Sequence, residues 1–433
     1  MSALARYFKS LGAKVGGYDR TPTALTDQLQ QEGIEVMFED NPFKVWRDAD
    51  LVVYTPAIPK DNECFDLFRH KNNPMMKRSQ VLGLISAERF TIAVAGSHGK
   101  TTVSSMIAHI LTQSGFGCSA FLGGIAVNYN SNYLQGQNDV VVIEADEFDR
   151  SFHRLSPDMA VVTAVDTDHL DIYGSKEAID EAFLEFVGKV AEDGFLVVKN
   201  NQSINEKLPV LDKAFYDLHD TEADVYCSKY WVVDGGYLFN VNFFGTEMRG
   251  LRLNIGGFHN IENALAAITI AKELRITDEH IKAALASFKG IKRRFEKLVD
   301  NERHVFIDDY AHHPEEIRVF LESVKEIYPK RKITAIFQPH LFSRTKDLAD
   351  GFAKALSAVD EVVLLDIYPA RELPMEGVTS ELIYNQLTCA KKSLVKKEDL
   401  VDTLRQRNDL DVVLTIGAGD IDKYLDGIKA LLQ

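Results

Sequence analysis

An apolar run that leads directly into a glycine-rich turn constrains the fold of this chain more than any other feature. Residues 91–95 are Thr-Ile-Ala-Val-Ala, and apolar residues with helical spacing follow at positions 106, 107, 110 and 111. The turn between them reads Gly96, Ser97, His98, Gly99, Lys100, Thr101 and Thr102. This strand–turn–helix order is typical of a phosphate-binding loop, because glycines let backbone N–H groups close on phosphate oxygens at the positive end of a helix.

The chemistry of that turn predicts a nucleoside triphosphate as the ligand. A lysine in the position of Lys100 reaches the β- and γ-phosphates, and a hydroxyl in the position of Thr101 ligates Mg²⁺. All of residues 96–102 are therefore candidates for nucleotide binding. The loop is a shortened form, since Val94 stands where the strict pattern has its first glycine.

Length and composition are those of a globular enzyme with two or three domains. The 433 residues carry a formal net charge of −15, which argues against nucleic acid or an anionic membrane as the main partner but leaves room for a local basic site. No apolar stretch approaches membrane-spanning length, and no signal peptide is recognisable. The four cysteines show neither metal-ligand nor disulfide-framework spacing, so we expect reduced thiols in a cytoplasmic protein.

The alternation of strands and helices predicts an α/β protein of three domains. We expect a Rossmann-like N-terminal domain at residues 1–88 and a central ATPase-type domain with a parallel sheet at 89–290. The dipeptide Asp234-Gly235 between two apolar runs predicts a small antiparallel insert around 225–255. After the basic junction at 292–294 the α/β pattern starts again, which predicts a C-terminal Rossmann-like domain at 291–433, with strands at 304–307, 333–337, 361–365 and 411–416.

Carboxylates and a histidine follow two further strands of the central domain. Glu144 comes directly after the buried strand 139–143, and Asp168 and His169 follow the strand 159–165. An acidic loop is more often merely solvated, and a lone histidine more often a hydrogen-bonded loop residue. Their position downstream of a phosphate loop, at the carboxyl ends of parallel strands, favours Mg²⁺ ligands instead. We therefore expect Thr101 and Glu144 at one metal ion and His169 at a second.

Two asparagines open a later helix. Asn260 and Asn263 lie three residues apart, so that both amides can face one spot near the helix start and pair with the edge of a purine. Capping of the helix by Asn260 is the alternative, and the sequence by itself favours it.

Several segments together resemble the Mur ligases, the ATP-dependent amide-forming enzymes that add amino acids to the peptidoglycan precursor. In the central domain these are residues 95–102, Glu-Ala-Asp-Glu-Phe-Asp-Arg-Ser-Phe at 144–152, Asp-His-Leu-Asp-Ile-Tyr-Gly at 168–174 and His-Asn-Ile-Glu-Asn-Ala at 259–264. Lys-Arg-Arg-Phe-Glu follows at 292–296. Three C-terminal stretches, at 307–314, 337–345 and 417–421, resemble the branch that adds alanine.

The resemblance implies a ligase that joins L-alanine to the lactyl carboxylate of UDP-N-acetylmuramate through an acyl phosphate. It implies a UDP-sugar-binding domain, an ATP-binding domain and an amino-acid-binding domain in that order, and a monomer or homodimer. Its implied catalytic residues are Lys100, His169, His340 and Arg344, with Arg344 pairing the alanine carboxylate. Asn260 and Asn263 would read the adenine, Arg294 would meet ATP from the domain junction, and Asp309 would contact the nucleotide.

The chain departs from the family pattern at two places. Leu341 stands where this branch often has an arginine, so no charge role is transferred to that position. The family opens with a strand and a glycine-rich turn that cradles the UDP diphosphate, whereas this chain opens on a helix, and we expect residues 1–88 to lack both elements.

Two other functions stay open. A murein-peptide recycling ligase would join a whole peptide to the same sugar, and it shares most of these motifs. A phosphate-loop ATPase acting as a switch would hydrolyse nucleotide without forming an amide, but it leaves the C-terminal histidine and arginine segments unexplained.

Overall fold

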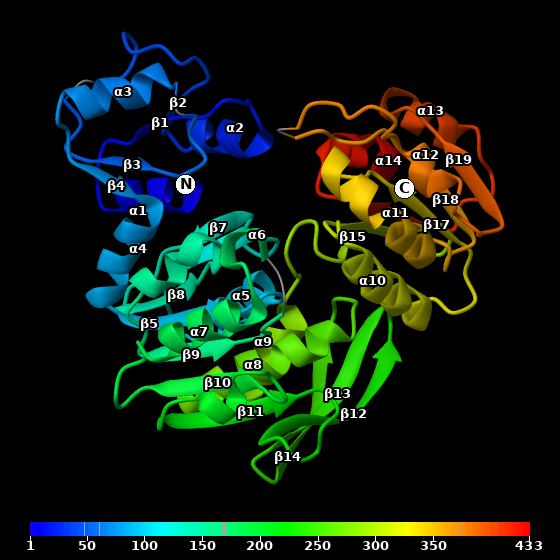
Figure 1. The fold of residues 1–433 in the computed structure, drawn as a ribbon. Helices are drawn as coiled ribbons and strands as arrows, with labels where there is room; N and C mark the ends of the chain where they lie inside the picture. The colour runs from blue at the N-terminus through cyan, green and yellow to red at the C-terminus, as the bar shows by residue number, and fades with distance from the viewer. Residues whose placement is uncertain (47, 60, 167–169, 371) are drawn as a thin grey trace. The chain divides into compact units, whose positions relative to one another are not determined.

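The computed structural model describes residues 1–433 except 47, 60, 167–169 and 371 (Figure 1). The chain forms two compact units. Unit 1 comprises residues 1–229, 240–251 and 262–286, and unit 2 comprises 230–239, 252–261 and 287–433. The bounds of the three domains that we inferred from the sequence remain a prediction. Within the described ranges, no helix has the length and apolar character needed to cross a membrane.

The first part of unit 1 is built from small parallel strand pairs and four helices. The strands β1 (Gly16–Tyr18) and β2 (Glu35–Met37) form one pair, and β3 (Val52–Tyr54) and β4 (Met75–Lys77) form another. The helices are α1 (Ser2–Ser10), α2 (Ala24–Gln31), α3 (Glu63–His70) and α4 (Arg78–Ala87). The α/β pattern expected for residues 1–88 is therefore present as two separate strand pairs rather than as one sheet.

A ten-stranded sheet follows, in the order β14-β13-β12-β11-β10-β9-β5-β8-β6-β7. Its parallel core consists of β5, β6 and β8 through β12, whereas β7 runs antiparallel to β6. The bounds are β5 Phe90–Ala95, β6 Ser119–Ala126, β7 Ser131–Leu134, β8 Val140–Glu144, β9 Met159–Val162, β10 Phe195–Lys199, β11 Asp212–Asp217, β12 Val225–Val233, β13 Gly236–Phe243 and β14 Thr246–Leu253. The last three strands form the insert expected at 225–255.

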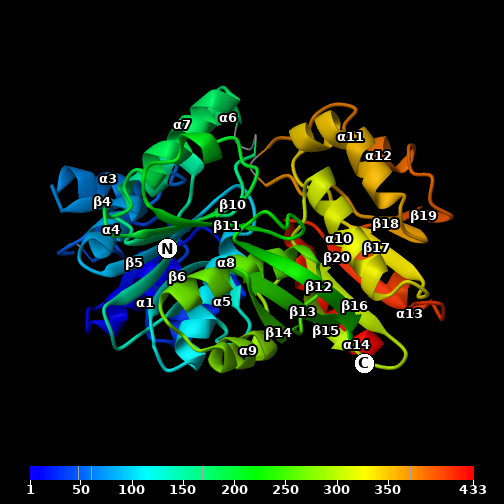
Figure 2. The same cartoon turned by 90° about the horizontal axis from the view of Figure 1, so that it is seen from below.

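Helices cover both faces of this sheet (Figure 2). The helix α7 (Lys176–Val187) lies over one face, and α5 (Lys100–Gln113), α8 (His259–Glu273) and α9 (Asp278–Ser287) lie over the other. The short helix α6 (Leu170–Tyr173) precedes α7, and the 3₁₀ segments η1 (Phe148–Arg154) and η2 (Asn205–Lys207) lie in connections. Strands that are buried on both faces need the near-continuous apolar runs that the sequence shows here.

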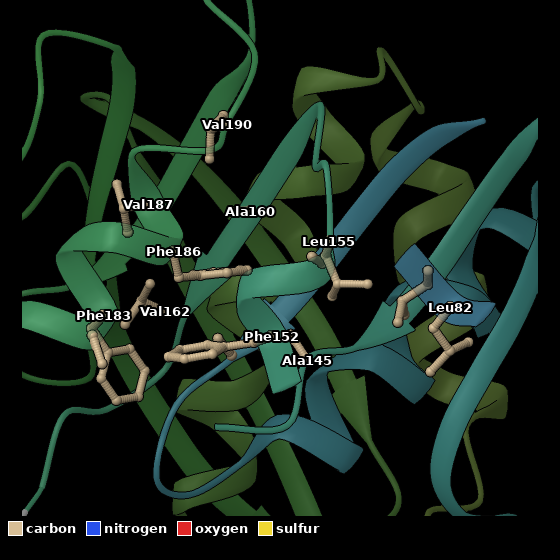
Figure 3. Close-up of a cluster of buried hydrophobic side chains, with 14 of the residues drawn as sticks. Leu82, Ala145, Phe152, Leu155, Ala160, Val162, Phe183, Phe186, Val187 and Val190 are labelled. Atoms are coloured by element: carbon tan, nitrogen blue, oxygen red, sulfur yellow. The ribbon is translucent and has the colours of Figure 1, made fainter. Parts of the chain in front are cut away.

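The 3₁₀ segment η1 is anchored in the apolar core of unit 1. The ring of Phe152 is 1% exposed and stacks on Phe186 of α7 with ring centres 5.0 Å apart. Figure 3 shows Phe152 within the cluster beside Phe183 and Phe186, with Leu155 and Leu82 further along. The connection from β8 to β9 is therefore fixed by the core.

Unit 2 contains a six-stranded sheet in the order β15-β16-β20-β17-β18-β19. The edge strand β15 is antiparallel, and the others pair in parallel. The bounds are β15 Glu296–Asp300, β16 Val305–Asp309, β17 Ile333–Phe337, β18 Glu361–Leu364, β19 Lys391–Leu394 and β20 Val412–Ile416. The four strands predicted from sequence are present, and the two edge strands β15 and β19 are additional.

Helices also cover both faces of the second sheet, as expected for a doubly wound fold. The helices α10 (Pro314–Ile327) and α11 (Phe342–Leu356) pack against each other, with α12 (Glu381–Tyr384) beside α11. The helices α13 (Leu400–Arg405) and α14 (Leu425–Leu432) enclose a second apolar cluster with β16 and β20; the 3₁₀ segments η3 (Lys397–Asp399) and η4 (Asp420–Tyr424) precede them. The α/β fold class inferred from sequence is confirmed.

Candidate active site

The glycine-rich turn joins β5 to α5 in unit 1 and has the backbone of a phosphate-binding loop. Gly96 and Gly99 adopt φ angles of 139° and 80°, which L side chains rarely adopt. A Cβ atom on Gly96 would lie 2.0 Å from the Thr163 hydroxyl, so the turn also needs glycine for space. That hydroxyl donates to the carbonyls of Ala95 and His98 and fixes the loop against the end of β9.

The lysine of the loop is held by three oxygen acceptors. Lys100 Nζ donates to the carbonyl of Gly96 at 2.5 Å and contacts that of Ser97 at 3.3 Å. It also donates to Glu147 Oε1 at 2.9 Å, and both side chains of this ion pair are largely buried. Burial raises the pKa of Glu147, and the charge of Lys100 opposes that rise. The ammonium is thus held within the loop, where phosphate oxygens would compete for it.

The first metal site expected from sequence brings two oxygen donors together. Thr101 Oγ1 donates to Glu144 Oε1 at 3.0 Å, and Glu144 Oε2 accepts the backbone N–H of Gly123 at 2.7 Å. Burial raises the pKa of Glu144, while Lys100 and these two hydrogen bonds oppose the rise. A hydroxyl and a carboxylate side by side are hard oxygen donors, so this pair fits Mg²⁺. Thr102 follows in the first turn of α5.

The loop after β9 also meets the phosphate loop. Ser97 Oγ accepts the backbone N–H of Asp166 at 2.9 Å, and His98 Nε2 lies 3.6 Å from the Asp166 carboxylate. The ends of β5, β8 and β9 therefore converge, because β5 lies between the other two in the sheet. His169, expected at a second metal ion, and Asp168 lie outside the described residues.

The two asparagines of α8 are both buried, but their contacts differ. Asn263 lies against the phosphate loop: a Cβ atom on Gly99 would be 2.6 Å from its Oδ1. Asn260 donates through Nδ2 to the carbonyl of Gly256 at 2.7 Å. An N-cap side chain would accept a backbone N–H, so this donation is a different contact from the expected cap. Recognition of adenine by the pair stays a prediction.

In unit 2, Arg294 and Asp309 lie near one another at the carboxyl end of β16. The guanidinium of Arg294 lies over the ring of Tyr310, 5.3 Å from its centre. Both carboxylate oxygens of Asp309 accept backbone N–H groups, from Phe295 at 2.7 Å and Ala311 at 2.8 Å. Burial raises the pKa of Asp309 to about 6, against the opposing charge of Arg294. The contacts of Asp309 fasten two turns of the backbone, and its predicted contact with nucleotide is untested.

The two residues predicted at the amino-acid site lie at the start of α11. His340 stacks on Tyr368, with ring centres 5.7 Å apart, and meets His312 edge to face at 6.2 Å. Burial, together with the charges of Arg344 and His312, lowers the pKa of His340 to about 4. Arg344 Nη1 and His340 Nδ1 are buried with no hydrogen-bond partner among the described residues. An unpaired buried guanidinium nitrogen is costly, so it suits an anionic ligand.

Several residues at these sites were missed by the sequence analysis. Glu147 stood in the acidic segment at 144–152 but received no role, although it pairs with Lys100. Arg293, adjacent to the predicted Arg294, binds the Asp308 carboxylate at 3.1 Å and the carbonyl of Gly417 at 2.5 Å. Leu341, which the sequence analysis noted as a departure from the family pattern, has a φ of 68° and directly precedes α11. These residues stand within motifs that the sequence shows, but their partners could not be predicted because the contacts join segments that are distant in the chain.

Three family models match the chain and together cover most of its length. The model described as Mur ligase family, catalytic domain, matches residues 1–90. The Mur ligase middle domain matches residues 94–271, and the Mur ligase glutamate ligase domain matches residues 293–419.

Whole-chain relatives agree with these matches. A UDP-N-acetylmuramate–L-alanine ligase from Flavobacterium johnsoniae is 47% identical over 438 residues, covering 100% of this chain and 95% of the relative. A crystal structure of UDP-N-acetylmuramate–alanine ligase from Thermotoga maritima superposes with a TM-score of 0.86 at 30% identity, covering 98% of this chain and 95% of that one. A murein peptide ligase from Psychrobacter arcticus has a TM-score of 0.72 at 23% identity, covering 100% and 96%, and so shares the fold.

Proposed function

The chain belongs to the Mur ligase family, and we propose on that premise that it joins L-alanine to UDP-N-acetylmuramate at the expense of ATP. The observation that carries the proposal is the convergence of Lys100, Thr101 and Glu144 at the ends of the adjacent strands β5 and β8. This arrangement supplies a cation, a hydroxyl and a carboxylate where the phosphates of a nucleotide would lie. The alanine-ligase relative supports the choice of amino acid.

The reaction needs two steps, because a carboxylate is a poor electrophile. A lactyl carboxylate oxygen attacks the γ-phosphorus of ATP, the bond to the bridging oxygen breaks, and ADP leaves as the acyl phosphate forms. The neutral amine of L-alanine then attacks the acyl carbon, phosphate leaves with the bonding electron pair, and the nitrogen gives up a proton. The products are the amide, ADP and phosphate.

The residues of unit 1 serve the first step. The backbone N–H groups of the phosphate loop and the positive end of α5 bind the phosphates. Lys100 exchanges Glu147 and the loop carbonyls for phosphate oxygens, and its charge stabilises the transferring group. Thr101 and Glu144 would hold Mg²⁺, which offsets negative charge on the phosphates when it is bound.

The residues of unit 2 serve the amino acid. Arg344 would pair with the alanine carboxylate through the nitrogen that is buried and unpaired. His340 stays neutral near pH 7, since its pKa is lowered to about 4, so it adds no second charge beside that carboxylate. Arg294, Asp309 and the two asparagines of α8 are assigned to the nucleotide by resemblance to the family.

The alternative reactions differ in the amino-acid substrate. A murein-peptide ligase would take a peptide in place of alanine; the likeness to such an enzyme at 23% identity carries the fold and not that activity. A switch ATPase would hydrolyse ATP without requiring alanine or a peptide. The same assay separates all three functions.

The deciding experiment measures phosphate release from ATP with Mg²⁺ and UDP-N-acetylmuramate present. We expect L-alanine to stimulate release, glycine and L-serine to act more weakly, and murein tripeptide to have no effect. A tripeptide that works better than L-alanine would reassign the chain to peptide recycling. Release that is independent of the UDP-sugar and of any amino acid would identify a switch ATPase.

A further inference from the structure

The loop that follows β18 pairs with the turn that precedes α11. The backbone N–H of Leu341 donates to the carbonyl of Tyr368 at 2.9 Å, and the N–H of Tyr368 donates to the carbonyl of Pro339 at 2.8 Å. His340 and Tyr368 form an isolated parallel bridge, so the pairing of β17 with β18 resumes beyond both strands. The turn that carries His340 is therefore fixed to this loop by its backbone.

Leu341 needs that support, because its φ of 68° lies in the left-handed region that leucine rarely adopts. Its N–H is bound to Tyr368, and its carbonyl accepts both the backbone N–H of Thr345 at 3.1 Å and the Thr345 hydroxyl at 2.7 Å. A strained backbone conformation persists only where its neighbours fix it from several sides. The loop after β18 supplies one of those sides.

The start of α11 has no cap from its own N-cap residue, Leu341, whose side chain carries no polar atom. Glu372 of the loop supplies the cap instead. Its Oε2 accepts the backbone N–H of Ser343 at 2.9 Å, and its Oε1 accepts the Ser343 hydroxyl. Ser343 is the second residue of the helix, whose N–H an N-cap side chain ordinarily binds. The hydrogen bonds from the hydroxyl and the backbone of Ser343 lower the pKa of Glu372, so a carboxylate lies at the positive end of the helix.

The same first turn carries Arg344, the residue assigned to the carboxylate of the amino acid. Arg344 follows Ser343 directly, and its Nη1 is buried with no hydrogen-bond partner among the described residues. Before the helix, the ring of His340 stacks on Tyr368 with ring centres 5.7 Å apart. Tyr368 thus holds His340 directly, whereas Glu372 acts on the position of Arg344 through Ser343.

The remainder of α11 is anchored without Glu372. Ala349, Phe352 and Leu356 are buried, and the ring of Phe352 lies 5.3 Å from that of Phe337 on β17. The helix also packs against α10 and α12. Loss of the cap should therefore loosen the first turn while the helix stays folded, so a variant at Glu372 reports on the first turn rather than on the stability of the whole domain.

We propose that Glu372 is a positioning residue of the amino-acid site. By binding the N–H and the hydroxyl of Ser343, it orients the first turn of α11 so that the guanidinium of Arg344 can receive the carboxylate of the amino acid. This role rests on the ligase function proposed above, and Glu372 itself does not touch the substrate. Orientation in advance strengthens binding, because a loosely held arginine must be ordered when the ligand arrives.

The test is steady-state phosphate release with L-alanine and ATP varied in turn, at saturating UDP-N-acetylmuramate and Mg²⁺. Glu372→Ala should raise the KM for L-alanine by about 5- to 10-fold, the loss expected for a helix cap, and leave the KM for ATP unchanged. Glu372→Gln should recover most of that loss, because its amide oxygen can accept the N–H of Ser343 and its nitrogen can donate to the hydroxyl. Glu376→Ala, on an exposed glutamate of the same loop, is the matched control.

A double-mutant cycle decides whether Glu372 acts through Arg344. In an Arg344→Ala background, Glu372→Ala should change the KM for L-alanine by less than about twofold, because the group that it orients is gone. Ser343→Ala removes only one of the two hydrogen bonds to the carboxylate, so its effect should be smaller than that of Glu372→Ala. A full effect of Glu372→Ala in the Arg344→Ala background overturns the proposal, because the carboxylate then acts independently of the guanidinium.

The remaining outcomes distinguish a failure of this role from a failure of the ligase function. An unmodified chain whose phosphate release does not depend on L-alanine overturns both. An alanine-dependent chain in which Glu372→Ala keeps the KM for L-alanine overturns the positioning role alone. A merely structural role would lower the maximal rate and the melting temperature with that KM unchanged, so this result also contradicts the proposal.

Discussion

Glu147 lies 2.9 Å from the ammonium of Lys100, so the cation meant for the nucleotide already has an anionic partner within unit 1. A phosphate group that binds the loop must displace this carboxylate or share the lysine with it. Glu147 therefore competes with the phosphate oxygens of the nucleotide for the positive charge of Lys100.

Glu147→Gln should therefore strengthen nucleotide binding. The amide keeps the shape and an oxygen acceptor but removes the competing charge, and we expect the dissociation constant for ADP to fall by about 3- to 10-fold, a gain of about 1 kcal/mol. Calorimetric titration with ADP measures the change. Glu192→Gln, on an exposed turn, is the matched control, and weaker ADP binding by Glu147→Gln would show that the carboxylate supports the loop instead.

Lys100→Ala should abolish turnover while the chain remains folded. The lysine acts on charge that develops at the γ-phosphate, and the loss of such a contact costs on the order of 10²- to 10³-fold in kcat. Phosphate release in single-turnover conditions, with circular dichroism of the same sample, measures both properties. A rate close to that of the unmodified chain would remove Lys100 from the reaction.

Glu144→Gln should impair turnover in a way that depends on Mg²⁺. Replacing the carboxylate with an amide weakens a metal ligand, so the Mg²⁺ concentration giving half-maximal rate should rise about tenfold or more, with partial recovery at high Mg²⁺. The measurement is the rate across a Mg²⁺ titration. An unaltered titration curve would place the ion elsewhere.

Arg344→Ala should affect the amino acid selectively. A charge-assisted pair with the alanine carboxylate is worth about 1.5–3 kcal/mol, so the KM for L-alanine should rise about 10- to 100-fold while that for ATP changes little. Steady-state kinetics with each substrate varied in turn provides the comparison. If the KM for ATP moves further, the residue belongs to the nucleotide site.

His109 should make the stability of the chain depend on pH. Its side chain is 1% exposed, and burial lowers its pKa from 6.5 to about 4, against a weaker opposing hydrogen bond from the ring to the backbone of Ala284. Below pH 6.5 the unfolded chain binds a proton that the folded chain resists, so stability falls from pH 6.5 to 4 by about 3 kcal/mol.

His109→Gln isolates that contribution, because glutamine can still reach the hydroxyl of Tyr129, which lies 2.8 Å from His109 Nδ1. Denaturant midpoints measured between pH 4 and pH 7 should be less pH-dependent in the variant. Parallel curves for the two proteins would assign the acid sensitivity to other groups.

The features of the fold that follow from local sequence could be predicted. The order of strand, glycine turn and helix at 90–113 depends on adjacent residues, and so does the hairpin turn at Asp234 and Gly235, where both φ angles are positive. The edge strands β15 and β19 could not be predicted, because their sequences are polar and become strands only through pairing with β16 and β18.

The candidate site divides in the same way. Lys100, Thr101 and Glu144 could be placed because parallel strands end at one edge of a sheet. The pairing of Glu147 with Lys100 could not, because it depends on how the segment after β8 turns back toward the loop. A cavity lined by Lys77 and Arg154 was missed for a similar reason, because these residues are 77 positions apart in the chain and meet only when α4 packs against η1.

The strand order in the sheet of unit 2 determines when its central strands can pair during folding. The strand β20, at residues 412–416, lies between β16 and β17, which begin 107 and 79 positions earlier in the chain. Until the ribosome has added β20, β16 and β17 lack the neighbour that joins them, and each keeps an edge that could pair with another chain. Completion of this sheet is therefore slow, because it depends on pairing between strands that are distant in the chain.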